Sequence, residues 1–139
     1  MISLLNTTRN LSFCTVPAAW VLCIAPHIYA VKLYDWASPV KKFDKVNPRT
    51  LLASLDANDD LEGAIKERIR RAEAAQLNGY ENLGFFAAAV VAANVAKVDP
   101  WWTDTLSAGF LASRVLFNIL YITGVKGQVR GTVFYFGIG

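Results

Sequence analysis

The apolar residues of this chain gather into segments of membrane-crossing length, and this clustering restricts the fold more than any other feature. The first segment covers residues 12–33, about 22 residues, which as a helix crosses a hydrocarbon core of about 30 Å. Two more cover residues 77–96 and 102–122, the latter with paired tryptophans at its start, as in an interfacial aromatic belt. A fourth, residues 128–139, spans only about 18 Å as a helix. We therefore expect the fourth helix to be short or truncated.

The composition agrees with a lipid environment. Of the 139 residues, 54% are hydrophobic and 18% charged, against roughly 45–50% and about 25% in ordinary globular chains. We therefore predict an all-α fold, a transmembrane four-helix bundle formed by one domain over residues 1–139, with membrane lipids as its surroundings. The net charge of +3 is too small to indicate a nucleic-acid partner. Cys14 and Cys23 would point to opposite sides of a helix, which argues against a disulfide, and no metal-ligand spacing is present.

The distribution of basic residues predicts the topology. Eight lysines and arginines lie between residues 34 and 71, whereas the opposite side of the membrane holds only Arg9 and Lys97. Positive loops mark the cytosolic side, so we place the link 34–76 in the cytosol and both termini in a lumen, which suggests the endoplasmic reticulum. Within the link, Asp59 and Asp60 precede a run of helix formers. We expect a helix of about 35 residues that begins near Asp60 and continues unbroken into the second span.

Polar residues enter the second span in one helical register. Arg71, Asn78 and Glu81 are separated by seven and three residues, which places them on one face of a helix. Ala74 and Ala75 lie between them and would leave room for a partner helix or a ligand. A charged side chain in a span costs about 2.5–3.5 kcal/mol on insertion scales, so such groups usually face a bundle interior or a cavity.

The third span repeats this pattern with Arg114 and Tyr121, and Arg130 opens the fourth segment at the cytosolic mouth. Singly, a buried glutamate is often part of a structural ion pair, and a tyrosine at a membrane edge is often part of the aromatic belt. Together, these cationic and amide donors suit an anionic, peptide-like ligand, because arginine binds carboxylates in a forked geometry and Glu81 can accept from an amine. His27, in the first span, is interpreted as a polar contact between helices.

The second-span motif R-x-x-A-x-x-x-N-x-x-E-N, residues 71–82, resembles that of the MAPEG family, the membrane-associated proteins in eicosanoid and glutathione metabolism. Arg114-x-x-Phe117-x-x-x-Tyr121 and the later Arg130 extend the resemblance, which is greatest to the compact fungal-type members related to microsomal glutathione transferases. The resemblance implies a four-helix transmembrane bundle assembled as a homotrimer. It also implies that glutathione is bound as a co-substrate between neighbouring subunits, near the cytosolic face.

The resemblance further implies roles for individual residues. Tyr121 and Arg130 would be catalytic and contact the thiolate of glutathione. The expected glutathione-binding residues are Lys32, Arg71, Gln76, Asn78, Glu81 and Arg114. Among them, Glu81 would take the α-amino group and the two arginines the carboxylates, whereas Lys32 would reach the ligand of a neighbouring subunit unless it only extends to the membrane surface. Some relatives carry arginine at the position of Ala74 and tyrosine or histidine at that of Phe117, so the chain departs from them there.

These features indicate an integral-membrane, glutathione-dependent transferase or peroxidase that takes a hydrophobic small-molecule substrate, an electrophile, from the bilayer. Two other functions remain open. The chain is alternatively a non-catalytic module that binds a lipid, or a tailoring isomerase or cyclase of natural-product biosynthesis.

Overall fold

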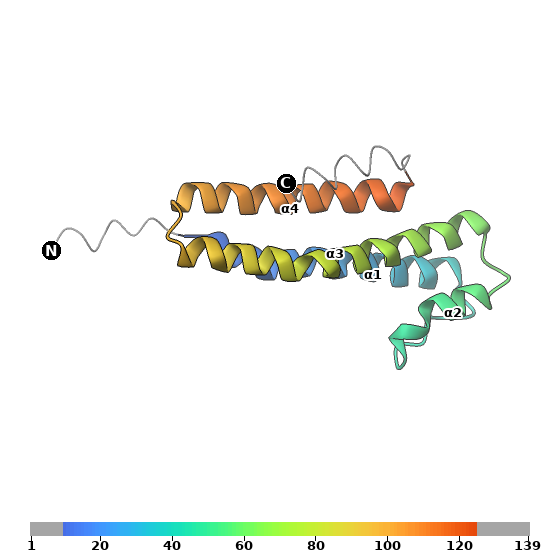
Figure 1. The fold of residues 1–139 in the computed structure, drawn as a ribbon. Coiled ribbons are helices and arrows are strands. Elements are labelled where there is room, and N and C mark those ends of the chain that lie inside the picture. Colours follow the sequence, from blue (N-terminus) through green and yellow to red (C-terminus); the bar gives the residue numbers. More distant parts are fainter. Residues whose placement is uncertain (1–9, 125–139) are drawn as a thin grey trace.

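The computed structural model describes residues 10–124, and within this range the chain is helical, without a β-strand. Three long helices, α1 (Ser12–Ala37), α3 (Gly63–Val95) and α4 (Pro100–Thr123), lie side by side and alternate in direction (Figure 1). The predicted all-α fold is confirmed over this range. The predicted fourth segment, residues 128–139, and Arg130 lie outside the described residues.

Two of the described helices, α1 and α4, are long and apolar enough to cross a membrane. They contain the predicted segments 12–33 and 102–122. The start of α4 follows from its sequence, because the Asp99 carboxylate accepts a hydrogen bond from the Trp101 backbone N–H at 2.8 Å and Pro100 occupies the first turn. Gly124 ends α4 in the left-handed conformation, with φ of 79°.

The expected long helix is present as α3, an unbroken helix of 33 residues that begins at Gly63, close to the predicted start. Its first half carries the charged residues of the link, and its second half contains the apolar segment that begins at Leu77. The helix therefore extends out of the apolar part of the bundle into the cytosolic link predicted from the sequence.

The contact between α1 and α3 is close because small residues meet there. A Cβ atom added to Gly79 of α3 would lie 3.0 Å from Sγ and 3.3 Å from Cα of Cys23 in α1. Further along the same interface, Ala19 packs in one apolar cluster with Phe86 and Val90. Both cysteines are free, with Cys23 buried and Cys14 exposed.

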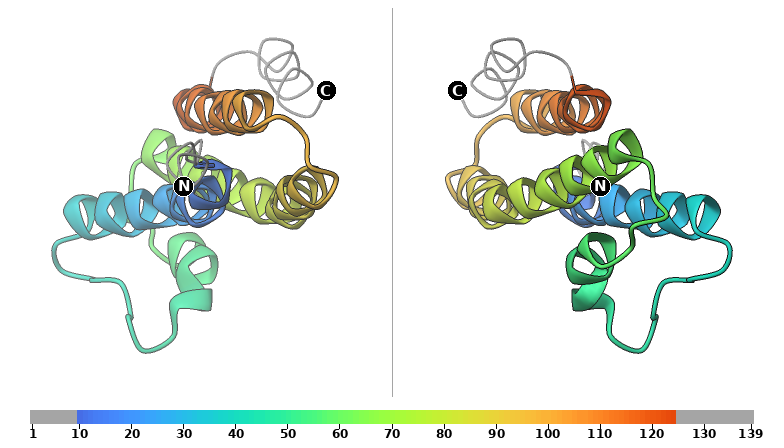
Figure 2. Two further views of the ribbon diagram at one scale, coloured as in Figure 1. Left: turned by 90° about the vertical axis from the view of Figure 1, so that its left-hand side faces the viewer. Right: turned by 90° about the vertical axis from the view of Figure 1, so that its right-hand side faces the viewer.

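The link between α1 and α3 packs against the ends of these helices (Figure 2). It contains a short 3₁₀ helix, η1 (Pro48–Thr50), followed by α2 (Leu51–Asp56). Its apolar core consists of Ala30, Tyr34, Phe43, Leu51, Leu55, Leu61, Ile69 and Ala72. The link is thus a folded part of the molecule, built on the C-terminal end of α1 and the N-terminal end of α3.

At the opposite end of the bundle, polar contacts join the start of α1 to the other two long helices. The Leu11 backbone N–H donates to the Asp104 carboxylate of α4, with N···O distances of 3.0 and 3.2 Å. Asn94 of α3 donates from Nδ2 to the Ser12 hydroxyl at 3.0 Å. These contacts fix the positions of α1, α3 and α4 relative to one another along the bundle axis.

Candidate functional site

The polar residues predicted on α3 and α4 meet where these helices pack together. Nη1 of Arg114 in α4 donates a hydrogen bond to Oδ1 of Asn78 in α3 over 3.4 Å. The Arg114 side chain is buried, with the residue only 4% exposed. Two of the predicted ligand-binding residues are therefore joined directly within one chain.

Aromatic rings surround the buried guanidinium. Its Cζ atom lies 4.9 Å from the ring centre of Phe117 and 5.4 Å from that of Phe110, within the range of cation–π attraction. Phe117 in turn contacts the half-buried ring of Tyr121, with ring centres 5.3 Å apart. Phe117 thus packs between the guanidinium of Arg114 and the ring of Tyr121.

Arg71 contacts the C-terminal end of α4. Its Nε donates to the Ile122 carbonyl oxygen over 3.2 Å, in the last turn of that helix. An added Cβ at Gly124 would lie 3.2 Å from the Arg71 Cζ atom. A positive charge at a helix C-terminus compensates the partial negative charge of the carbonyl groups there. Arg71 therefore connects α3 to α4 on the same side as the contact between Arg114 and Asn78.

The remaining predicted residues are not drawn into this contact. Glu81 is exposed, and no residue in the described range forms a hydrogen bond or ion pair with its carboxylate. Gln76 is half-buried on α3, and Lys32 is exposed near the C-terminal end of α1. Arg130 is outside the described range, so its role stays a prediction from the sequence.

The alanines between Arg71 and Asn78 do not both leave open space. Ala75 is buried, with 1% of its surface exposed, whereas Ala74 is only partly buried. At Ala75 the room beside the polar residues is thus filled by packing within the chain, which the expectation of a partner helix or a ligand allows.

The sequence interpretation missed a polar contact that involves Glu73. His27 and Glu73 join α1 to α3, with Nδ1 and Oε1 2.8 Å apart and both side chains mostly buried. The expectation of an interhelical contact for His27 is confirmed. The sequence indicated Glu73 as its partner only weakly: Glu73 is an acid that lies between Arg71 and Asn78 of the predicted polar face.

The donors at this site have a defined chemical preference. Arg71 and the Asn78 amide can donate hydrogen bonds to carboxylate and carbonyl oxygens, and the exposed carboxylate of Glu81 on the same helix offers an acceptor for an ammonium group. A short peptide with free carboxylates and a free amine matches this set. The donor set therefore favours binding of such a ligand near the end of α4.

Comparison with known proteins identifies the family of the chain. Neither the curated proteins nor the solved structures include a match to the chain. Residues 11–139, in contrast, match the MAPEG family, a match that covers all three long helices and every candidate site residue. Its members generally use glutathione, and the two apolar helices agree with an integral membrane protein. The chain belongs to the MAPEG family.

Proposed function

We propose that the protein is an integral-membrane glutathione transferase that conjugates glutathione to hydrophobic electrophiles. The observation that carries the proposal is the contact of Arg114 with Asn78, with Arg71 bound to the end of the same helix. These contacts bring together hydrogen-bond donors of the kind that a peptide with free carboxylates requires, beside apolar helices. Membership of the family supports glutathione as the peptide.

Different residues of the site bind different groups of glutathione. Arg71 uses Nε to bind Ile122, which leaves its two terminal nitrogens to pair with a carboxylate. Arg114 is buried, so we assign to it the positioning of Asn78, whose amide binds the peptide backbone of the ligand. Glu81 takes the α-amino group, and Gln76 and Lys32 contribute further polar contacts at the cytosolic end.

The exposure of Glu81 supports assembly into a homotrimer. This carboxylate lies in the part of α3 that enters the apolar bundle, and the described range offers it no partner. A carboxylate that faces lipid is costly, which favours a position at a subunit boundary or a cavity. A ligand held between Glu81 and a neighbouring subunit satisfies this requirement.

Tyr121 and Arg130 are the proposed catalytic residues. When bound, glutathione supplies a thiol, and its thiolate form is the nucleophile. A positive charge from Arg130 and a hydrogen bond from Tyr121 stabilise the thiolate over the thiol. Lowering the thiol pKa from about 8.5 to about 6.5 ionises most of it at pH 7.

We further propose the endoplasmic reticulum as the location, with the folded link in the cytosol and both termini in the lumen. The support is the concentration of lysines and arginines in the link and in the first half of α3. In this orientation, the glutathione site opens towards the compartment of the link.

Glutathione binding is the direct test. Purified protein is mixed rapidly with glutathione, thiolate absorbance is followed, and affinity is measured by calorimetry. We expect a thiolate signal and a dissociation constant that rises at least tenfold in Glu81→Gln. Glu62→Gln, an exposed acid in the link, is the matched control and keeps the parental affinity. Absence of both binding and thiolate absorbance in the parental protein would refute the transferase.

A further inference from the structure

The link between α1 and α3 extends sideways from the bundle. From the end of α1 it runs away from α4, and it turns back at the start of η1 (Figure 2). Along the bundle axis, this turn is level with the C-terminal end of α4 and does not lie beyond it (Figure 1). Since α4 is a membrane-spanning helix, its end marks the height of one membrane surface. The link therefore projects over the lipid headgroups around the bundle.

One buried side chain attaches this part of the link to the protein. Phe43 is 6% exposed, and its ring meets that of Tyr34 in α1 edge to face, with ring centres 6.4 Å apart. The Phe43 backbone N–H also donates to the Asp35 carboxylate at 2.8 Å. All other residues of the segment 39–49 are exposed. The segment is therefore fixed at Phe43, while its remaining side chains face outward.

The outward side chains include two valines next to lysines. Val40 is 91% exposed and Val46 is 93% exposed, the highest values among the large apolar side chains of the described range. Lys41 follows the first valine, and Lys45 precedes the second. Such pairs suit the boundary of a bilayer, because the valine can enter the acyl region while the ammonium group stays among the phosphates. Exposure to water alone offers these valines no contact.

The same segment carries an excess of positive charge. Residues 39–49 contain one acid, Asp44, and four basic residues, Lys41, Lys42, Lys45 and Arg49. The resulting net charge of +3 equals that of the whole chain, so the other residues are neutral on balance. The Asp44 carboxylate accepts from the Val46 backbone N–H at 2.9 Å. Basic clusters directly beside a membrane-spanning helix are typical of segments that bind anionic lipids.

Two of these cations are available to a partner outside the chain. Lys42 donates to the Asp35 backbone oxygen at 2.8 Å, and Lys41 lies 3.6 Å from the Asp60 carboxylate. Within residues 10–124, Lys45 and Arg49 form neither an ion pair nor a side-chain hydrogen bond. Ammonium and guanidinium groups form charge-assisted hydrogen bonds with phosphates and carboxylates, which anionic headgroups supply.

We propose that residues 39–49 are a docking surface for anionic phospholipids of the surrounding membrane. Val40 and Val46 enter the boundary between headgroups and acyl chains, and Lys45 and Arg49 bind the phosphates of adjacent lipids. Each basic group near an anionic surface favours binding roughly fivefold. The proposal requires only that the protein spans a membrane, and it does not depend on glutathione or on a transferase activity.

Spin labelling of the full-length protein in nanodiscs tests the proposal. The label is attached to Val46→Cys in a Cys14→Ala background, because Cys14 is exposed whereas Cys23 is buried. Its accessibility to a water-soluble nickel chelate is compared in phosphatidylcholine nanodiscs with and without phosphatidylserine. We expect phosphatidylserine to shield the label, and about 0.5 M salt to reverse the shielding, because salt screens exposed charges.

Paired variants test the role of the free cations. Lys45→Gln combined with Arg49→Gln should lower the ratio of shielded to accessible label roughly 25-fold, fivefold for each charge removed. Arg68→Gln combined with Lys97→Gln removes two exposed charges outside the segment and should retain the shielding. Equal accessibility of the label in the two lipid compositions, or equal shielding in the two double variants, would overturn the proposal.

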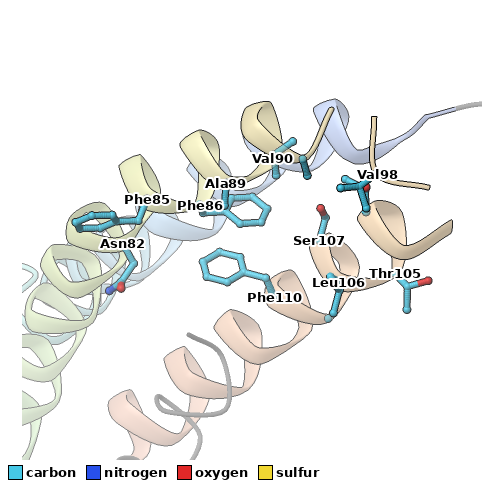
Figure 3. Close-up of a pocket in the computed structure, with 13 residues that line it drawn as sticks. Asn82, Phe85, Phe86, Ala89, Val90, Val98, Thr105, Leu106, Ser107 and Phe110 are labelled. Carbon is cyan, nitrogen blue, oxygen red and sulfur yellow. The ribbon is translucent and has the colours of Figure 1, made fainter. Parts of the chain in front are cut away.

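A photocrosslinking amino acid identifies what covers the segment. Benzoylphenylalanine at Val46 should attach to phosphatidylserine in preference to phosphatidylcholine in equimolar nanodiscs. The control position is Leu106 of α4, 67% exposed at the apolar groove between α3 and α4 (Figure 3), where acyl chains of both lipids should react equally. Attachment at Val46 to a second copy of the chain, or without preference between the lipids, would refute anionic lipid as the partner.

Discussion

The Asn118 side chain in α4 donates a hydrogen bond from Nδ2 to the Leu22 carbonyl oxygen in α1 over 3.0 Å. Leu22 lies four residues before Pro26, which has no backbone N–H, so this carbonyl lacks its helical donor. In a membrane interior, an unsatisfied carbonyl group is expensive because water is absent. Asn118 therefore compensates for the proline and at the same time attaches α4 to α1.

Asn118→Ala is expected to destabilise the protein by about 0.6–2 kcal/mol, the range measured for hydrogen bonds between membrane helices. The loss should be smaller in a Pro26→Ala background, because the substituted alanine restores the backbone N–H donor within α1. Unfolding in mixed micelles, followed by circular dichroism, measures all four members of the cycle. Equal losses in both backgrounds would contradict the compensation.

Arg114→Lys is expected to weaken glutathione binding about tenfold, roughly 1.4 kcal/mol. Lysine keeps the charge, but it lacks the planar fork that bonds to Asn78 and stacks against Phe110 and Phe117. Calorimetric titration provides the comparison. Arg68→Lys, at an exposed position of α3, serves as the control. If Arg114→Lys binds glutathione as tightly as the control, Arg114 does not contribute to glutathione binding.

The sequence predicted the three long helices α1, α3 and α4 well, and the contacts between them less well. Asp99-Pro100 at the start of α4 is a local signal, and local signals define helix ends without reference to the rest of the chain. The helical register placed Arg71, Asn78 and Glu81 together, yet only the first two contact α4. The helical register determines which residues share one face of a helix. Which side of that helix a neighbouring helix covers depends on packing.

The same distinction explains the contacts that sequence reasoning did not find. The bond from Asn118 to Leu22 and the pair of His27 with Glu73 join residues far apart in the chain. No periodic pattern in the sequence links such residues, because each contact depends on how two helices are positioned relative to each other along the bundle axis. A proline in a span does signal a carbonyl in need of a donor, but it does not identify the donor.

Asn58→Ala is expected to destabilise the folded link by about 1–3 kcal/mol. Asn58 is 1% exposed, and its Nδ2 donates to the hydroxyls of Ser38 at 2.9 Å and Tyr34 at 3.3 Å. Truncation leaves both buried hydroxyls without this donor. Limited proteolysis should therefore cut the link sooner in Asn58→Ala than in Asn47→Ala, an exposed asparagine of the same segment. Equal rates of cleavage would argue against a structural role of Asn58.

Gly79→Ala is expected to loosen the contact between α1 and α3, because the added Cβ would lie 3.0 Å from the Cys23 sulfur. Overpacking of this kind costs about 1–3 kcal/mol. Thiol labelling with a maleimide reports it directly, since Cys14 is exposed and Cys23 is buried. In the parental protein we expect fast modification of Cys14 alone, and in Gly79→Ala measurable modification of Cys23 as well.

The control for this experiment is Gly84→Ala, because an added Cβ at Gly84 meets no atom within 4 Å. It should stabilise α3 slightly, since alanine favours helix over glycine by about 1 kcal/mol, and it should leave Cys23 protected. Cys23→Ala combined with Gly79→Ala should recover part of the lost stability by removing the sulfur, although Cα and Cβ of residue 23 remain at 3.3 Å. If Cys23 stays protected in Gly79→Ala, the two helices are not in close contact at this point.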